Sequence, residues 1–137
     1  MENRFKFRVW NKKEKTMHYE AEKTYDFMTG KPVICEESFG ELLEDKDYIV
    51  MQCIGIKDKN EKLIYEGDIV RLEGNDNPYM NNVIGVAKYS NRYAMFYINI
   101  PDNIAWYEFN EVEKKGLSVI GNIYENKELL NGNKNKI

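Results

Sequence analysis

The segment Val83–Ile100, with the sequence VIGVAKYSNRYAMFYINI, carries the clearest β-hairpin pattern in this chain. Two runs, Val83–Tyr89 and Tyr93–Ile100, flank the turn Ser90–Arg92. In the second run every other residue suits an apolar core: Ala94, Phe96, Ile98 and Ile100. This period of two is typical of a strand with one buried face, so the segment predicts two antiparallel strands joined by a short turn.

Short strand patterns continue on both sides of this hairpin. They cover Arg4–Trp10, Thr16–Tyr19, Tyr25–Met28, Val33–Cys35, Tyr48–Ile56, Lys62–Tyr65, Asp68–Leu72, Ile104–Phe109 and Leu117–Ile123. One helix is predicted, over Phe39–Lys46, because Ser38 and Glu41 have the spacing of a capping box and an apolar stripe of Phe39, Leu42 and Leu43 follows. Strands of this length and spacing favour a mainly β (α+β) fold with small antiparallel, barrel-like sheets.

The expected organisation is two lobes and a tail. We expect an N-terminal β lobe with the short helix over residues 1–62 and a barrel-like lobe over 63–124. Residues 125–137 are expected to form a short helical turn and a mobile, polar tail. The stretch Tyr65–Val70 (YEGDIV) resembles the opening of SH3-like barrels, which suggests an SH3-like C-terminal lobe.

Length and composition describe a globular protein. The chain has 137 residues, 42% of them apolar and 31% charged, and a formal net charge of −3. No apolar run approaches the ~18 residues of a membrane helix, and the first residues lack the apolar region of a signal peptide. We therefore expect a cytoplasmic protein without membrane contact. Cys35 and Cys53 lie far from any other thiol or imidazole in sequence, so two buried thiols are expected rather than a metal site.

The sequence motifs give little support for enzymatic activity. His18 is the single histidine and has no recognisable nucleophile signature around it. No glycine-rich phosphate loop is present. Glu66–Asp68 could bring two carboxylates to a Mg²⁺ ion, but Asp68 is better interpreted as the cap of a turn. We predict no catalytic residue, no metal and no cofactor.

Charge is unevenly distributed along the chain. Residues 4–15 hold six cations and one carboxylate, a formal charge of +5, whereas residues 36–47 hold six carboxylates and one cation, a charge of −5. Such segments are compatible with internal pairing, with head-to-tail contact between copies, or with solvated faces.

Two surfaces are candidates for binding. The N-terminal strand would project Arg4, Lys6 and Arg8 together with Trp10 from one face. In the hairpin, Tyr89, Tyr93 and Tyr97 would form a stripe on the face opposite Phe96. Such tyrosines suit a protein interface or stacked bases, and the pI of about 5.3 favours protein. The sequence thus predicts a non-enzymatic, homo-oligomeric protein-interaction module. The alternative is a nucleic-acid-binding accessory protein that uses the basic N-terminal strand and surface aromatic residues.

Three blocks of the sequence match a known family pattern in the same order. Phe7–Trp10 (FRVW) is similar to an opening FRxW, and Val119–Asn126 (VIGNIYEN) to a closing VIGNIYEN. Met51–Val70 (MQCIGIKDKNEKLIYEGDIV) resembles a central MQxTGLxDKNGxxIYEGDIV. With these blocks the chain resembles the YopX family, small proteins encoded by phages and prophages of bacteria.

Two positions depart from the family pattern. Cys53–Ile54 stands where the family more often has an aromatic or polar residue and Thr. Glu61 replaces the turn Gly, which makes a tight Asn-Gly type of turn less favoured there. The resemblance implies a mainly β protein of phage or prophage origin that self-associates, and it brings no established activity.

Overall fold

The computed structural model describes residues 2–23, 37–74, 78, 81–101, 105–112 and 116–135. They fall into two compact units, Met1–Gly55 and Ile56–Ile137. The division expected from the sequence lies later, after residue 62. The expected strands Tyr25–Met28 and Val33–Cys35 lie outside the described residues, as do parts of the loops around residues 75 and 103.

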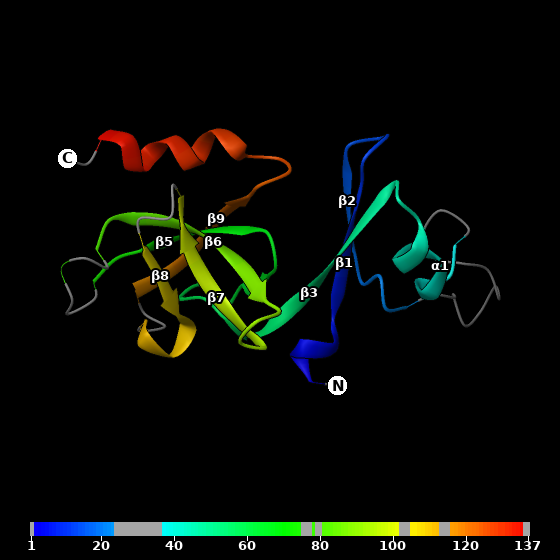
Figure 1. Cartoon of the computed structure of the whole chain (residues 1–137), viewed down its shortest axis with the longest axis horizontal. Helices are drawn as coiled ribbons and strands as arrows, with labels where there is room; N and C mark the ends of the chain where they lie inside the picture. The colour runs from blue at the N-terminus through cyan, green and yellow to red at the C-terminus, as the bar shows by residue number, and fades with distance from the viewer. Residues whose placement is uncertain are drawn as a thin grey trace. The chain divides into compact units, whose positions relative to one another are not determined.

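The described part of the chain is mainly β with one short α-helix, as the sequence predicts (Figure 1). Its elements are η1 (Asn3–Phe5), β1 (Phe7–Asn11), β2 (Thr16–Tyr19), α1 (Phe39–Glu44), β3 (Tyr48–Lys57), β4 (Leu63–Tyr65), β5 (Asp68–Leu72), β6 (Val83–Ser90), β7 (Met95–Ile100), β8 (Ala105–Glu108), η4 (Phe109–Glu111), β9 (Leu117–Asn122) and η6 (Lys127–Asn135), where η marks a 3₁₀ helix.

In the first unit β1 is the middle strand, flanked by β2 and β3 in antiparallel pairings. Val9 lies opposite His18 on β2 and Val50 on β3. The core beneath this face contains Val9, Ala21 and Leu42, with Phe7, Phe39, Tyr48 and Val50 packed against it. The ring centroids of Phe7 and Phe39 are 4.9 Å apart, so α1 is held to the sheet mainly by apolar contact.

The capping box of α1 forms as predicted. The Glu41 backbone N–H donates to Ser38 Oγ and the Ser38 N–H donates to Glu41 Oε1, each at 3.2 Å. The helix ends at Glu44, two residues earlier than expected, and Leu43 is exposed instead of facing the core. Two turns of helix bury only the face that carries Leu42.

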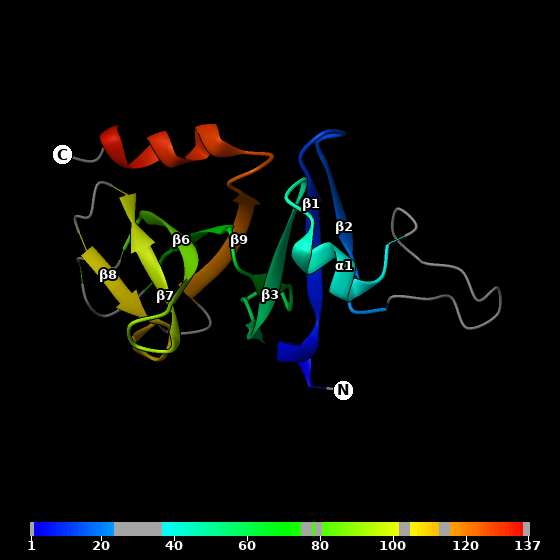
Figure 2. The same ribbon diagram turned by 45° about the vertical axis from the view of Figure 1, so that its right-hand side comes forward.

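In the second unit five antiparallel strands form a curled sheet in the order β8-β7-β6-β5-β9 (Figure 2). The strand β3 runs past Gly55 into this unit, where its end pairs with β4. The core holds the fully buried residues Ile64, Ile69, Val70, Leu72, Ile98 and Leu117. A register shift between Ile69 and Val70 bends the β5–β9 pair, which increases the curl of the sheet.

The central hairpin has the predicted strand order, and Ile98 and Ile100 lie on the predicted core side. β6 and β7 pair from Val86 with Asn99 to Ser90 with Met95, and Ile98 and Ile100 are buried. The turn is longer than expected, because β6 extends through Ser90 and β7 begins only at Met95. Ala94 therefore lies in the turn, exposed and with φ of 52°, rather than in the core.

The block Val119–Asn126 contains a tight turn that follows β9, and this turn requires several of its residue types. Asn122 Oδ1 accepts the backbone N–H groups of Tyr124 (3.0 Å) and Glu125 (2.9 Å). A Cβ at Gly121 would lie 2.6 Å from Asn126 Oδ1, so the turn packs where only glycine fits. The 3₁₀ helix η6 follows and contacts β6; it reaches Asn135, well beyond the expected helical turn.

Candidate functional site

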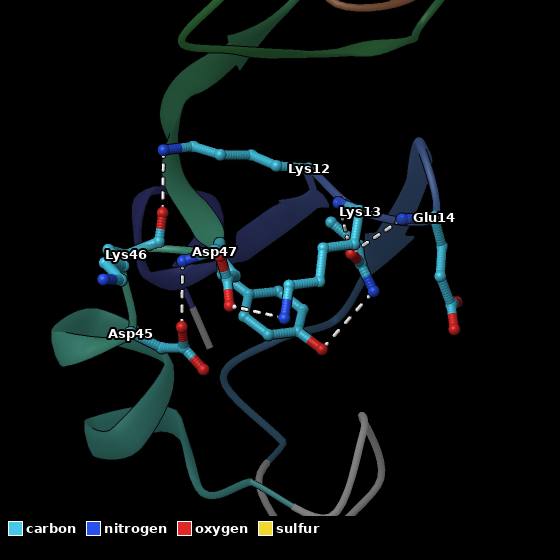
Figure 3. A network of polar contacts seen from close by, with 8 residues as sticks. Lys12, Lys13, Glu14, Asp45, Lys46 and Asp47 are labelled. Atoms are coloured by element: carbon cyan, nitrogen blue, oxygen red, sulfur yellow. Dashed lines mark hydrogen bonds and ion pairs between the residues drawn. The ribbon is translucent and has the colours of Figure 1, made fainter.

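The oppositely charged segments meet within the first unit (Figure 3). Lys13 Nζ forms an ion pair with Asp47 Oδ2 at 3.2 Å, and Lys12 Nζ donates to the Lys46 backbone carbonyl at 2.7 Å. Asn11 Oδ1 fixes the neighbouring turn by accepting the N–H groups of Lys13 and Glu14. The alternatives for these segments were internal pairing, head-to-tail contact between copies, and solvated faces. Lys13 and Asp47 show internal pairing, and contact between copies stays a prediction.

The N-terminal strand does not form the basic face that the sequence suggested. β1 starts at Phe7, and Arg4 lies on η1, where its Nε pairs with Glu2 Oε2 at 2.6 Å. Lys6 is half-buried. Arg8 and Trp10 are only 2% and 8% exposed, so the prediction that they project to solvent is wrong.

Both faces of β1 are buried. Alternation does place Arg8 and Trp10 on the face opposite Val9, yet their side chains are buried there too, and β1 is flanked by β2 and β3. Arg8 Nη1 donates to Tyr19 Oη at 3.4 Å, and its guanidinium carbon is 5.8 Å from the centroid of that ring. Arg8 is thus part of the packing of the first unit.

The tyrosines of the central hairpin divide between two faces. Tyr89 pairs in register with Phe96, and the two ring centroids are 5.1 Å apart. Tyr97 points to the other face, together with Tyr93 from the turn. The predicted stripe of three tyrosines is therefore a pair, with Tyr89 on the opposite side of the sheet.

Trp106 completes this surface, although the sequence analysis did not single it out. It lies opposite Asn99 on the edge strand β8, which places it diagonal to Tyr97 on the same face. Its ring is nearly parallel to that of Tyr93 (centroids 6.1 Å, 16°) and perpendicular to that of Tyr97 (6.0 Å, 86°). Tyr93 is 57% and Trp106 50% exposed. We call this surface of Tyr93, Tyr97 and Trp106 the aromatic face.

A hollow of about 240 Å³ opens on the aromatic face. It is lined by the three aromatic residues together with Ser90, Met95 and Asn99. Charges surround it unevenly: Tyr97 lies between Lys88 on β6 and Glu108 on β8, and the Arg92 guanidinium carbon is 5.4 Å from the Tyr93 ring centroid. The surface can therefore take an apolar or aromatic group and orient it through polar neighbours.

The carboxylates near the central block serve the fold. Asp68 is buried and accepts the Tyr65 N–H at 2.8 Å, which is the turn-capping interpretation, and Gly67 has φ of 85°. Asp58 is fully buried and accepts the N–H groups of Asn60 (2.8 Å), Lys62 (2.9 Å) and Val119 (2.8 Å). Burial raises the pKa of Asp58, but these donors and the Lys62 charge outweigh it and hold the pKa below its ordinary value.

A second, wider hollow of about 570 Å³ lies beside α1 and is lined by Glu37, Ser38, Gly40, Glu41, Glu44 and Asp45. The pKa of Glu37 is raised above its ordinary value. The largest cause is a side-chain hydrogen bond to Asp45, and desolvation and the neighbouring negative charges add to it. The described residues contain no group of three or more His, Cys, Asp or Glu side chains placed to hold a metal ion.

The remaining candidates have structural surroundings. His18 Nε2 lies 3.0 Å from Thr16 Oγ1 on the same strand. Cys53 is a buried free thiol, as expected, and Cys35 lies outside the described residues. In the part of the chain that the structure describes, we find no helix with the length and apolar character needed to cross a membrane.

Comparisons with known proteins agree with the resemblance seen in the sequence. The model of the YopX family, described as YopX protein, matches residues 6–131. The crystal structure of protein EF1440 from Enterococcus faecalis is similar, with 25% identity, a TM-score of 0.61 and coverage of 91% of this chain and 96% of that one. Protein yopX from Bacillus subtilis shares the fold at 20% identity, with a TM-score of 0.56 and coverage of 92% and 98%. The comparison with curated proteins gave no match.

Proposed function

This chain belongs to the YopX family, and we propose that it is a non-enzymatic binding protein that recognises other proteins through its aromatic face. The observation that carries the proposal is the exposure of Tyr93, in the turn before β7, and of Trp106, on β8, beside a hollow. Tyrosine and tryptophan combine an apolar ring with a polar group that stays hydrated, and they are enriched in protein–protein interfaces. Two large rings that stay half in water contribute less to the stability of the free chain than buried rings would.

The buried carboxylates support the non-enzymatic part of the proposal. Among the residues that the structure describes, Asp58 and Asp68 are the buried carboxylates, and both accept backbone N–H groups within a turn. A general acid or base has to reach a substrate proton within hydrogen-bond distance, which a fully buried carboxylate engaged in this way does not.

Nucleic-acid binding has lost one of the two features that favoured it. The alternative used a basic N-terminal strand together with surface aromatic residues, and Arg8 and Trp10 of that strand are buried. A mobility-shift assay at low salt, with single-stranded and duplex probes, tests what is left of it. Binding that weakens as salt rises would favour the alternative over the proposal.

Self-association and phage origin remain parts of the proposal that rest on the family resemblance. Light scattering at tens of micromolar protein tests the first part, with a species larger than 16.2 kDa as the expected result. A clean monomer would remove self-association from the proposal.

The aromatic face is tested in the same measurement with three variants. Tyr93→Ala and Trp106→Ala should shift the mass toward that of the monomer if copies meet there. Tyr89→Ala is the matched control, because Tyr89 is also exposed (42%) but lies on the opposite side of the sheet. An equal effect of all three variants would contradict a specific role of the aromatic face.

A further inference from the structure

The size of the hollow on the aromatic face limits what it can hold. Its volume is about 240 Å³. An apolar cavity of about 150 Å³ holds benzene, whereas sites for drug-sized ligands span about 300–1,000 Å³. The hollow therefore suits one or two residues of a larger chain better than a whole cofactor.

The charges around the hollow distinguish between a peptide and a nucleic acid. Lys88 and Arg92 lie on the side of β6 and the turn, and Glu108 lies on the side of β8. A nucleic-acid strand carries a negative charge at every nucleotide, so its path across the face would meet the Glu108 carboxylate. A peptide can place an acidic residue beside Lys88 and Arg92 and leave the β8 side neutral or basic.

The lining of the hollow favours an extended peptide rich in proline. Tyr93 and Trp106 present nearly parallel rings, and the perpendicular Tyr97 ring closes one side. Aromatic-lined hollows of this kind bind polyproline II segments, whose rings pack on the aromatic faces at low cost in entropy. The backbone carbonyls of such a segment have no internal partners and can accept from the Asn99 amide and the Ser90 hydroxyl, which both line the hollow.

We propose that the aromatic face binds a proline-rich peptide segment that carries an acidic residue next to its prolines. The prolines occupy the hollow between Tyr93, Tyr97 and Trp106, and the acidic side chain pairs with Arg92 or Lys88. This inference rests on the proposed function, because it names the partner of the same surface.

The test is a fluorescence titration of the full chain with a short synthetic peptide of prolines and glutamates. Trp106 is half-exposed and Trp10 buried, so a ligand on the aromatic face should change the Trp106 signal. Trp106→Ala and Tyr93→Ala should each weaken binding at least about tenfold, as central aromatic contacts do, and Tyr89→Ala should leave it unchanged. Nuclear magnetic resonance shifts confined to β6–β8 provide a readout that does not require tryptophan.

Two matched peptides and one oligonucleotide complete the design. Replacing the glutamates by lysine should weaken binding several-fold, more at low salt than at high salt, and replacing the prolines by alanine should abolish it. Binding of a thymidine oligonucleotide in place of the peptide would overturn the inference. Peptide binding that survives both Tyr93→Ala and Trp106→Ala would overturn it too. No peptide binding, while the same variants still break self-association, would overturn the inference and leave the proposed function standing.

Discussion

The turn Asp58–Lys62 buries a charged group, whereas the aromatic face of the same unit exposes large apolar ones. Asp58 is fully buried, and its carboxylate accepts three backbone N–H groups. Trp106 and Tyr93 leave half of their surface in water. Burial of a charge is tolerated where both carboxylate oxygens accept hydrogen bonds, as they do here, so the turn serves stability. Exposure of aromatic rings contributes less to stability and is typical of a surface that binds.

This comparison predicts its largest effect at Asp58. Asp58→Ala removes the acceptor of three N–H groups, two in the turn and one on β9, and should destabilise the protein by about 3 kcal/mol. Chemical denaturation measures the loss. Asn60→Ala is the control, since Asn60 is an exposed residue of the same turn, and it should change stability by less than about 0.5 kcal/mol. Equal losses of stability in the two variants would contradict a specific stabilising role of the buried Asp58 carboxylate.

The same carboxylate predicts a dependence on pH. The pKa of Asp58 is lower in the folded chain than its ordinary value, so its stabilising effect is complete above the ordinary pKa and is lost as pH falls through the folded pKa. The difference in unfolding free energy between the wild type and Asp58→Asn should therefore be constant from about pH 7 to about pH 5 and shrink toward about pH 3. A difference that grew on acidification would contradict the lowered pKa.

Gly85 tests how tightly the sheet packs under the aromatic face. A Cβ at Gly85 would lie 2.5 Å from Ile98 Cγ2, so Gly85→Ala should destabilise the protein by about 2 kcal/mol through overpacking. At Gly40 in α1 the added Cβ has no neighbour within 4 Å among the described residues beyond the helix's own backbone and the adjacent residues, and Gly40→Ala should stabilise by up to about 1 kcal/mol. Thermal unfolding of both variants checks the contrast. A neutral Gly85→Ala would show that β7 can move away from β6.

A substitution of Glu61, in the turn Asp58–Lys62, should have a smaller effect on stability than the destabilising variants above, and of the opposite sign. It has φ of 64°, a conformation that favours glycine, the residue the family pattern has there. Glu61→Gly relieves this strain and gives up a solvent-exposed ion pair with Lys57, so we expect a gain of about 0.5–1 kcal/mol. A loss of stability would mean that the contacts of the Glu61 side chain outweigh the strain.

The local patterns predicted most of the fold. Thr16–Tyr19 forms β2 with the bounds read from the sequence, and the capping box at Ser38 begins α1. Glu61 was expected to disfavour a tight turn, yet the turn forms with this residue in the left-handed region, because Asp58 holds it from within. A turn propensity describes only the residues of the turn one by one, so it does not include the hydrogen bonds that the Asp58 side chain makes three positions before Glu61.

The surfaces were harder to predict because they depend on contacts between distant segments. The alternation in β1 correctly assigns Val9 and Arg8 to opposite faces, but it cannot tell that the second face is also buried. Trp106 joins Tyr97 only through the register of β7 and β8, which the sequence does not show. The signal that could have found Trp106 is its outward position in a predicted strand that follows Ile100 closely in the sequence.

The smallest effect on stability is expected at Tyr93, and it is where binding should respond most. The Tyr93 ring is more exposed than buried, and its backbone N–H donates to Ser90 Oγ whatever the side chain is. Tyr93→Ala therefore loses the stacking on Trp106 and the contact with the Arg92 guanidinium, and it should destabilise the protein by less than about 1 kcal/mol. Denaturation measured beside peptide titration checks both parts of this statement. A loss of stability as large as that of Asp58→Ala would mean that the aromatic face, like the turn, exists to hold the fold together, and the difference between the two regions would disappear.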